Sequence, residues 1–290
     1  MKARKAAGGI GRKLAAVICA AACTAALSPK TGLGLGSFAE EEEAEITAIT
    51  VETVLLDEAG DFTATVWLDE LPETGICALD FAIAYDPAVL KIDNVNLLYD
   101  TGAENVEILV NPDFAGTVFS YENTAGELRI RWGTGLSDPE FWLREERAFF
   151  TVSGHFGEDA GPGSGSALKI VPATRETAKD SGVPNSSVTA GYLDEEGGSH
   201  ICDTRLTNGG VWVILDETGA TRYGDLNMDG DITVSDAILM YRVLAEESAL
   251  SAAAYANADC EFDEVLTIAD VSLMLRVING ELEAKALGAH

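Results

Sequence analysis

The sequence predicts a two-sheet antiparallel β-sandwich followed by a small all-α module built from a duplicated loop and helix. Two observations support this prediction. Between Ile46 and Leu215 apolar residues recur with period two, and clusters of Gly, Pro, Asn and Asp interrupt them at the spacing of short strands. Between Tyr223 and Leu282 the chain repeats itself at a constant offset of 34 residues. We therefore expect one domain at 46–217 and a second at 223–282.

Four segments of the first block show the strand pattern most clearly. Apolar and polar residues alternate in 62–68, 77–85, 128–132 and 211–215. Successive side chains of a strand face opposite sides of its sheet, so one face of each segment is expected in the core. The block indicates no helix of convincing length, which favours two packed sheets of eight or nine strands.

The strand at residues 76–85 has an unusual second face. Ile76, Ala78, Asp80, Ala82 and Ala84 make this face small and nearly flat. Two interpretations are open at this point. Either a helix of a partner protein lies on the face, or another strand or a loop of the same chain covers it.

The first 39 residues are predicted to be an export signal. Basic residues precede an apolar run from Leu14 to Leu27 that is too short to span a bilayer comfortably, and residues 37–39 offer a cleavage site. A lipoprotein acylated at Cys23 is the less favoured alternative, because Ala20 stands where a bulkier apolar residue is expected. The mature chain is therefore expected to be secreted and extracellular.

The charge of the chain restricts its partners. Removal of residues 1–39 takes six of the 19 Lys and Arg residues and none of the 48 Asp and Glu residues, so the formal charge changes from −29 to −35. Such a field repels nucleic acid and anionic lipid and attracts divalent cations or basic partners. We expect no nucleic-acid or membrane partner, although solubility outside the cell explains much of the charge by itself.

Residues 225–236 carry the ligand pattern of a calcium-binding loop. Oxygen-bearing side chains stand at loop positions 1, 3, 5, 9 and 12, and Gly230 at position 6 permits a sharp turn. Without metal these acids would crowd like charges together, so cation binding and folding should be coupled. The alternative is an acidic turn before a capped helix. The expected ligands are Asp225, Asn227, Asp229, Asp231 through its carbonyl, Thr233 through a water, and Asp236.

Residues 259–270 repeat this pattern less completely. Acids again stand at positions 1, 3, 5 and 12, but Glu264 replaces the glycine. A side chain costs backbone strain where a left-handed turn is needed, so we expect weaker calcium binding in this loop. The expected ligands are Asp259, Glu261, Asp263, Val265 and Asp270.

The duplication continues into the helices. Each loop is followed by one helix, beginning near Val234 or Ile268, instead of being flanked by two. This distinguishes the module from a calmodulin-like sensor, and calcium is expected to be structural. The repeated residues are Ile232, Thr233, Asp236, Leu239, Met240, Arg242 and Val243, which recur as Leu266, Thr267, Asp270, Leu273, Met274, Arg276 and Val277.

By these residues the segment from Tyr223 to Leu282 resembles a dockerin, the calcium-folded module that joins components of bacterial cellulosomes to cohesin domains. The resemblance implies a cohesin as partner. Because the two repeats are nearly symmetric, either helix could make the main contact with the cohesin. Core packing is the alternative for the leucines and methionines, more so for the leucines. The implied contact residues are Val234, Ser235, Leu239, Met240 and Arg242, or their twins Ile268, Ala269, Leu273, Met274 and Arg276.

The first block resembles a cohesin, through the strand at 76–85 that runs into residues 85–90 and through the closing residues 210–213. This resemblance implies an all-β jelly-roll sandwich of about nine strands, which residues 158–199 fit poorly. A chain with one cohesin and one dockerin resembles a non-catalytic adaptor scaffoldin of plant polysaccharide degradation. Its sandwich would bind a dockerin-bearing enzyme or scaffoldin. The expected receiving surface is Ala78, Asp80, Ala82 and Ala84 with Arg129 and Arg131.

Two other functions compete with the adaptor. A carbohydrate-binding module would stack sugars on Trp67, Trp132, Trp142 or Trp212, of which Trp132 belongs to the inward set of its strand. A small glycoside hydrolase would need two carboxylates across a cleft, and the sandwich strands offer no paired acidic motif. We therefore expect no enzymatic activity.

Overall fold

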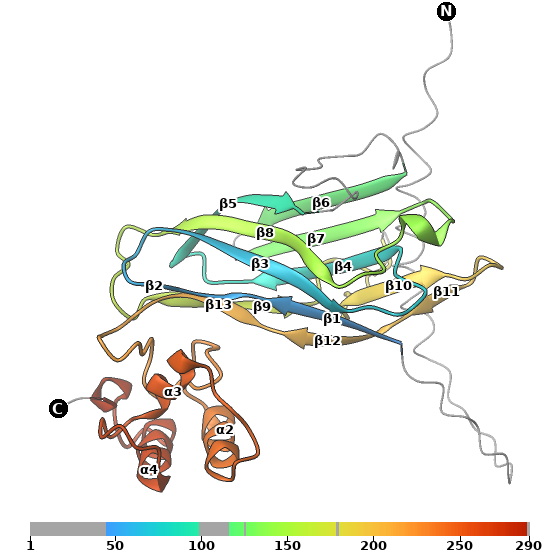
Figure 1. Ribbon diagram of the computed structural model, residues 1–290. Helices are drawn as coiled ribbons and strands as arrows, with labels where there is room; N and C mark the ends of the chain where they lie inside the picture. Colours follow the sequence, from blue (N-terminus) through green and yellow to red (C-terminus); the bar gives the residue numbers. More distant parts are fainter. Residues whose placement is uncertain (1–44, 99–115, 125, 178–179, 289–290) are drawn as a thin grey trace, which may run out of the picture.

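The computed structural model describes residues 45–98, 116–124, 126–177 and 180–288, so the predicted export signal lies outside the described residues. Within them a two-sheet β-sandwich is followed by three α-helices (Figure 1). The predicted fold class is confirmed. No helix in the described part is long and apolar enough to cross a membrane.

The smaller sheet has five strands. The two adjacent strands at one edge of this sheet are parallel, and all its other adjacent strands are antiparallel. In spatial order the strands are β12 (Asp203–Thr207), β1 (Ile46–Val51), β3 (Asp61–Glu70), β8 (Arg147–Phe156) and β5 (Leu90–Leu97).

The larger sheet has eight strands. In spatial order six of them are β11 (Ser199–Ile201), β10 (Thr189–Leu193), β4 (Ala78–Ala84), β9 (Gly165–Val171), β13 (Gly209–Val213) and β2 (Thr53–Leu56), while β7 (Glu127–Thr134) pairs with β4, and β6 (Thr117–Thr124) pairs with β7. β10 pairs with residues 78–80 of β4 and β9 pairs with residues 82–84, so these two strands share one edge of β4. β7 lies along the other edge.

The thirteen described strands exceed the expected number of about nine for two physical reasons. The chain changes sheets between β1 and β2 at Glu52 and between β12 and β13 at Asn208, which divides two long strands. A Cβ atom at Gly209 would overlap the carbonyl oxygens of Val51 and Glu52, so glycine is needed at this crossing. The hairpin of β10 and β11 adds two strands at residues 189–201, at the end of the stretch 158–199 where the period-two pattern is weak.

The core between the sheets contains most of the side chains that the period-two pattern directs inward in 62–68, 77–85, 128–132 and 211–213, together with residues outside these segments such as Leu90 and Phe149. Phe81 in β4 and Trp132 in β7 are both at most 1% exposed. In β8 two consecutive residues, Phe149 and Phe150, are both buried, because a register shift opposite Val66 lets neighbouring side chains point inward. Burial of this apolar area is the main stabilising contribution to the sandwich.

The flat face of β4 is covered, which corrects the expected receiving surface. Ala78, Asp80 and Ala82 are at most 2% exposed, and Ala84 is half-buried. Trp142 packs with Ala78, and part of the cover comes from the described residues 172–177 and 180–188, which lie between β9 and β10. The guanidinium of Arg175 from this segment bonds Asp80, with 3.3 Å between Nε and Oδ1. Of the two interpretations left open by the sequence, coverage by the chain itself is correct.

The helical module comprises α2 (Val234–Leu244), α3 (Ala252–Ala258) and α4 (Ile268–Ile278). Capping boxes start α2 and α4: Thr233 accepts a hydrogen bond from Ser235, and Thr267 accepts one from Ala269. A separate apolar core joins α2 to α4. Two short 3-10 helices, Pro139–Phe141 and Ala284–Ala286, complete the regular structure of the described residues.

We expect Gly154→Ala to destabilise the sandwich by about 1–3 kcal/mol, because a methyl group at this position overpacks the pairing of β5 with β8. Its Cβ would overlap the Lys91 carbonyl oxygen and lie 2.9 Å from Phe62 Cζ. Urea unfolding followed by tryptophan emission measures the effect. Gly60→Ala, whose Cβ meets nothing within 4 Å, is the matched control. Equal stability of the two variants would show that β5 and β8 have room for the methyl group.

Candidate functional site

The two ends of loop 225–236 are tied together by buried carboxylates. Asp225 and Asp236 are both 0% exposed. Asp225 accepts hydrogen bonds from the amides of Asp229 at 3.1 Å and Gly230 at 2.9 Å. Asp236 accepts others from the amides of Leu226 at 2.9 Å and Thr233 at 2.8 Å. The loop is thus wound around its own first and last acids.

Loop 259–270 repeats three of these four bonds at the same offset of 34 residues, and its fourth bond repeats one from the amide of Asn227 to Asp236 at 3.1 Å. Asp259 accepts from the amides of Asp263 at 3.0 Å and Glu264 at 2.9 Å. Asp270, also 0% exposed, accepts from the amides of Glu261 at 3.0 Å and Thr267 at 2.8 Å. The duplication therefore extends from the sequence to individual hydrogen bonds.

The backbone of the two loops turns in the left-handed region at equivalent positions. In the first loop these are Met228 at φ 55° and Gly230 at φ 91°, and in the second Phe262 at φ 61° and Glu264 at φ 65°. Glu264 therefore adopts the conformation of the glycine that it replaces. A non-glycine residue is strained there by roughly 1–2 kcal/mol, which agrees with the expected weakness of the second loop.

The electrostatics of the first loop favour a cation. The pKa of Asp225 is raised to about 7, chiefly by burial and also by the negative charges of Asp236 and Asp229, against the lowering effect of the hydrogen bond from the Gly230 amide. Oxygen donors dominate both loops, and such donors suit a hard ion such as Ca²⁺. In the described part of the chain, however, no group of three or more His, Cys, Asp or Glu side chains is arranged to hold a metal.

The other expected ligands lie at the surface of the loops. Asn227 and Asp231 are exposed, and Asp229 is half-buried. Thr233 is also half-buried and serves as the N-cap of α2. In the second loop Asp259 is half-buried, whereas Glu261, Asp263 and Val265 are exposed.

The structure reverses the expected roles of leucine and methionine in the helices. Met240 and Met274 are 0% exposed and lie in the shared core of α2 and α4, whereas Leu239 and Leu273 are half-buried. The cause is the helical phase, because each methionine lies one turn from a buried Asp236 or Asp270 on the same side. The other predicted contact residues lie at the surface: Val234, Ser235, Arg242, Ile268 and Arg276 are exposed, and Ala269 is half-buried.

An exposed apolar stripe on α2 was not predicted from the sequence. Val234, Ile238, Tyr241 and Leu244 are 55%, 54%, 48% and 37% exposed, respectively. Their spacing of four, three and three residues places them on one helix face, which was the signal available in the sequence. In α4 the corresponding face is less apolar and more covered: its residues are Ile268, Ser272, Leu275 and Ile278, of which the last two are half-buried.

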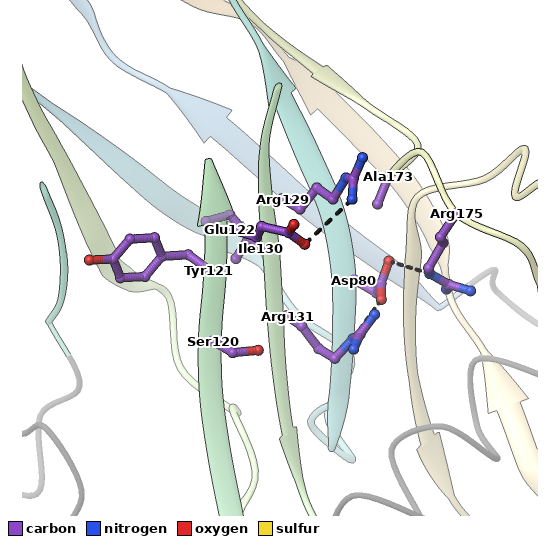
Figure 2. Close-up of a pocket in the computed structure, with 9 residues that line it drawn as sticks. All are labelled: Asp80, Ser120, Tyr121, Glu122, Arg129, Ile130, Arg131, Ala173 and Arg175. Atoms are coloured by element: carbon purple, nitrogen blue, oxygen red, sulfur yellow. Dashed lines mark hydrogen bonds and ion pairs between the residues drawn. The ribbon is translucent and has the colours of Figure 1, made fainter. Parts of the chain in front are cut away.

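The outer face of β4, β6 and β7 contains a pocket of about 360 Å³. Figure 2 shows that Asp80 lies between the guanidinium groups of Arg131 and Arg175, with 3.0 Å from its Oδ2 to Arg131 Nε. Arg129 pairs with Glu122 at 3.4 Å. The remaining lining residues are Ser120, Tyr121, Ile130 and Ala173. Of the predicted receiving residues, Asp80, Arg129 and Arg131 thus come together, and Arg175 joins them from a segment that the sequence left unassigned.

Among the four tryptophans only Trp67 is accessible. It is 41% exposed on β3, whereas Trp132, Trp142 and Trp212 are at most 7% exposed. Stacking on a sugar requires an open aromatic face, so these side chains form no row of platforms on the sandwich.

Comparison with known proteins assigns the C-terminal part. The family model described as dockerin type I domain matches residues 223–279. No curated protein matches the chain.

Several solved structures are similar to the chain at low identity. The sixth cohesin of scaffoldin B from Acetivibrio cellulolyticus, solved with a Cel5 dockerin, is 18% identical, covers 59% of this chain and 99% of its own, and has a TM-score of 0.40. A type I cohesin-dockerin complex from Clostridium thermocellum is 19% identical, covers 58% of this chain and 99% of its own, and has a TM-score of 0.42. The seventh ScaB type I cohesin from Pseudobacteroides cellulosolvens is 15% identical, covers 59% of this chain and 93% of its own, and has a TM-score of 0.43.

We expect Glu264→Gly to stabilise the chain by about 1 kcal/mol in the presence of calcium, because glycine adopts a positive φ without steric cost. Thermal unfolding measures the gain. Glu264→Ala is the matched control, since it removes the same charge but keeps the strain, and it should bring no such gain. If both variants are equally stable, the charge of Glu264 and not its backbone conformation limits the second loop.

We expect Asp225→Asn to remove most of the calcium-dependent rise in melting temperature. Asp231→Asn is the control, because it makes the same charge change on an exposed side chain.

With chelator present, the raised pKa of Asp225 means that the wild-type fold should lose stability as pH rises from about 4 to 7. Asp225→Asn should flatten this part of the profile, and a profile unchanged from wild type would contradict the assignment.

Proposed function

We propose that this chain, which carries a dockerin type I domain at residues 223–279, is a non-catalytic adaptor scaffoldin of a cellulosome-type complex. Its dockerin binds a cohesin of another scaffoldin, and its sandwich acts as a cohesin that binds a dockerin-bearing enzyme or scaffoldin. The observation that carries the proposal is a docking module joined to a sandwich of cohesin-like sequence pattern. On this proposal the chain is secreted and acts outside the cell in plant polysaccharide degradation.

Calcium holds the dockerin in its folded form in this proposal. Dockerin domains are generally calcium-binding. The hydrogen-bonded winding of 225–236 around Asp225 and Asp236 supports a firm site there. The strained Glu264 supports a weaker site in 259–270. The ligand sets are those that the sequence indicates, with Asp231 and Val265 contributing carbonyl oxygens.

The docking face is centred on α2 and not shared equally with α4. Val234, Ile238 and Tyr241 offer a continuous apolar stripe, and Arg242 lies beside it. The equivalent stripe on α4 is interrupted by Ser272. Because burial of apolar area drives most protein association, the cohesin partner is expected to contact mainly α2.

The receiving face of the sandwich is the pocketed surface of β4, β6 and β7. Its exposed parts include Ser120, the side chain of Glu122, at 68%, and the side chain of Arg131, at 50%. Arg131 is held by Asp80, so its guanidinium is presented in a fixed geometry to an acidic or polar group of the partner. The alanines of β4 support this surface from below instead of contacting the partner.

A carbohydrate-binding module carrying a dockerin is the alternative function. It is supported only by the exposed Trp67, because the other tryptophans are buried. Trp67 lies on β3 of the smaller sheet, whereas the receiving face belongs to the larger sheet. The two functions therefore make separable predictions about which surface matters.

We expect Ile238→Asp to abolish capture of the full-length chain by a panel of immobilised cohesins in the presence of calcium. Its twin Ser272→Asp is the matched control and should retain most binding.

The receiving face is tested separately. Capture of dockerin-bearing proteins should persist in both variants and should be lost in Ser120→Trp, which fills the pocket. The adaptor proposal fails if no cohesin and no dockerin is captured, and retention on polysaccharide that is lost in Trp67→Ala would favour the alternative.

A further inference from the structure

Trp212 is buried although it points away from the core. Its neighbours in β13, Val211 and Val213, belong to the core between the sheets. Strand alternation therefore directs the indole of Trp212 to the outer face of the larger sheet. It is nevertheless only 2% exposed. An outward side chain of this size stays buried only when another segment covers it.

Two glycines make room for the indole on the surface of the sheet. Gly165 is the cross-strand partner of Trp212 in β9, and Gly210 precedes it by two residues on the same face. A Cβ at Gly165 would lie 2.7 Å from Trp212 Cδ2, and one at Gly210 would lie 3.1 Å from Cε2. Contacts this short show that the ring lies flat against the backbone of both strands.

The cover is the first calcium loop. A Cβ at Gly230 would lie 3.4 Å from Trp212 Cη2, so the turn of the loop lies next to the indole. The adjacent Asp229 places its Oδ2 3.8 Å from Nζ of Lys169, which is on the same outer face of β9. Two neighbouring loop residues thus lie against the same outer face of the sheet, one at Trp212 of β13 and one at Lys169 of β9. In Figure 1 the helical module lies beside the sheet at β2, β9 and β13.

The residues that connect the two domains fix this contact. Thr221 is 2% exposed, and its amide donates to Oδ1 of the buried Asn257 at 2.7 Å. Asn257 also accepts from the amide of Arg222 at 3.0 Å and donates to the carbonyl of Asp225 at 2.7 Å. Arg222 in turn donates to the carbonyl oxygen of Gly230 at 2.6 Å. The connection and the calcium loop therefore form one hydrogen-bonded unit against the sandwich.

From these contacts we infer that the outer face of β9 and β13 is an interaction surface for loop 225–236, and that calcium binding in this loop is coupled to the sandwich. The inference rests on the proposed calcium site. Trp212 supports the wound turn at Gly230. Lys169 occupies the negative field of Asp229, a proposed ligand, and opposes the arrival of a divalent cation.

Tryptophan emission tests the coupling without any added probe. All four tryptophans precede residue 213, so the dockerin contains none of them. Calcium added to the full-length chain is expected to change the emission of wild type and of Trp67→Phe, but not of Trp212→Phe. A calcium-dependent change that persists in Trp212→Phe would overturn the inference, because the signal would then come from elsewhere in the sandwich.

Charge removal provides a second and milder variant. Lys169→Met keeps the aliphatic stem, and it is expected to tighten the first calcium site roughly three- to tenfold at low ionic strength, as measured by calorimetry. Lys91→Met, on β5 of the other sheet, should leave the affinity unchanged. Equal affinity of Lys169→Met and wild type would overturn the inference.

The outcomes also separate this inference from the proposed calcium site. If calorimetry detects no calcium binding to the wild-type chain, and Asp225→Asn melts with the wild-type profile, the calcium site itself is absent and the inference falls with it. If calorimetry detects binding but the emission of Trp212 does not respond, the site stands and only the contact with the sandwich is refuted.

Discussion

The helical module depends on hydrogen bonds from loop amides to buried or half-buried carboxylates. Asp225 and Asp236 close one loop, and Asp259 and Asp270 close the other. Hydrogen bonds to ionised acceptors are stronger than neutral ones, but an unneutralised buried carboxylate is costly. The same acids that shape the loops therefore create a demand for a cation. This constraint also positions α2 and α4, since Asp236 and Asp270 complete their capping boxes.

The sequence predicted this module well because its signals are local. The ligand spacing and the helix starts each lie within about a dozen residues, and the duplication provided an internal check. The exposure of the helix faces could not be predicted equally well. Met240 and Leu239 are adjacent and both apolar, and only the packing of α2 on α4 determines which of them is buried. The exposed Ile238 looked like any core residue at helical spacing.

In the sandwich the sequence predicted which side chains of a strand face the core, but it did not predict which strands and loops lie next to one another. Alternation correctly identified Phe81 and Trp132 as core residues. It could not show that the segment carrying Arg175 returns to β4, because the ion pair of Arg175 with Asp80 joins residues 95 positions apart. Trp212 illustrates the same limit, since its burial depends on a loop of the other domain.

The connection between the domains has a mechanical consequence. Leu215 donates to the carbonyl of Ala220 at 2.6 Å, and Tyr223 reaches back to Asp216 at 3.0 Å, so these residues are folded and do not form a free tether. A protein bound to the sandwich would therefore rotate together with the helical module. Any independent movement of that bound protein would then have to come from flexible segments in the binding partners.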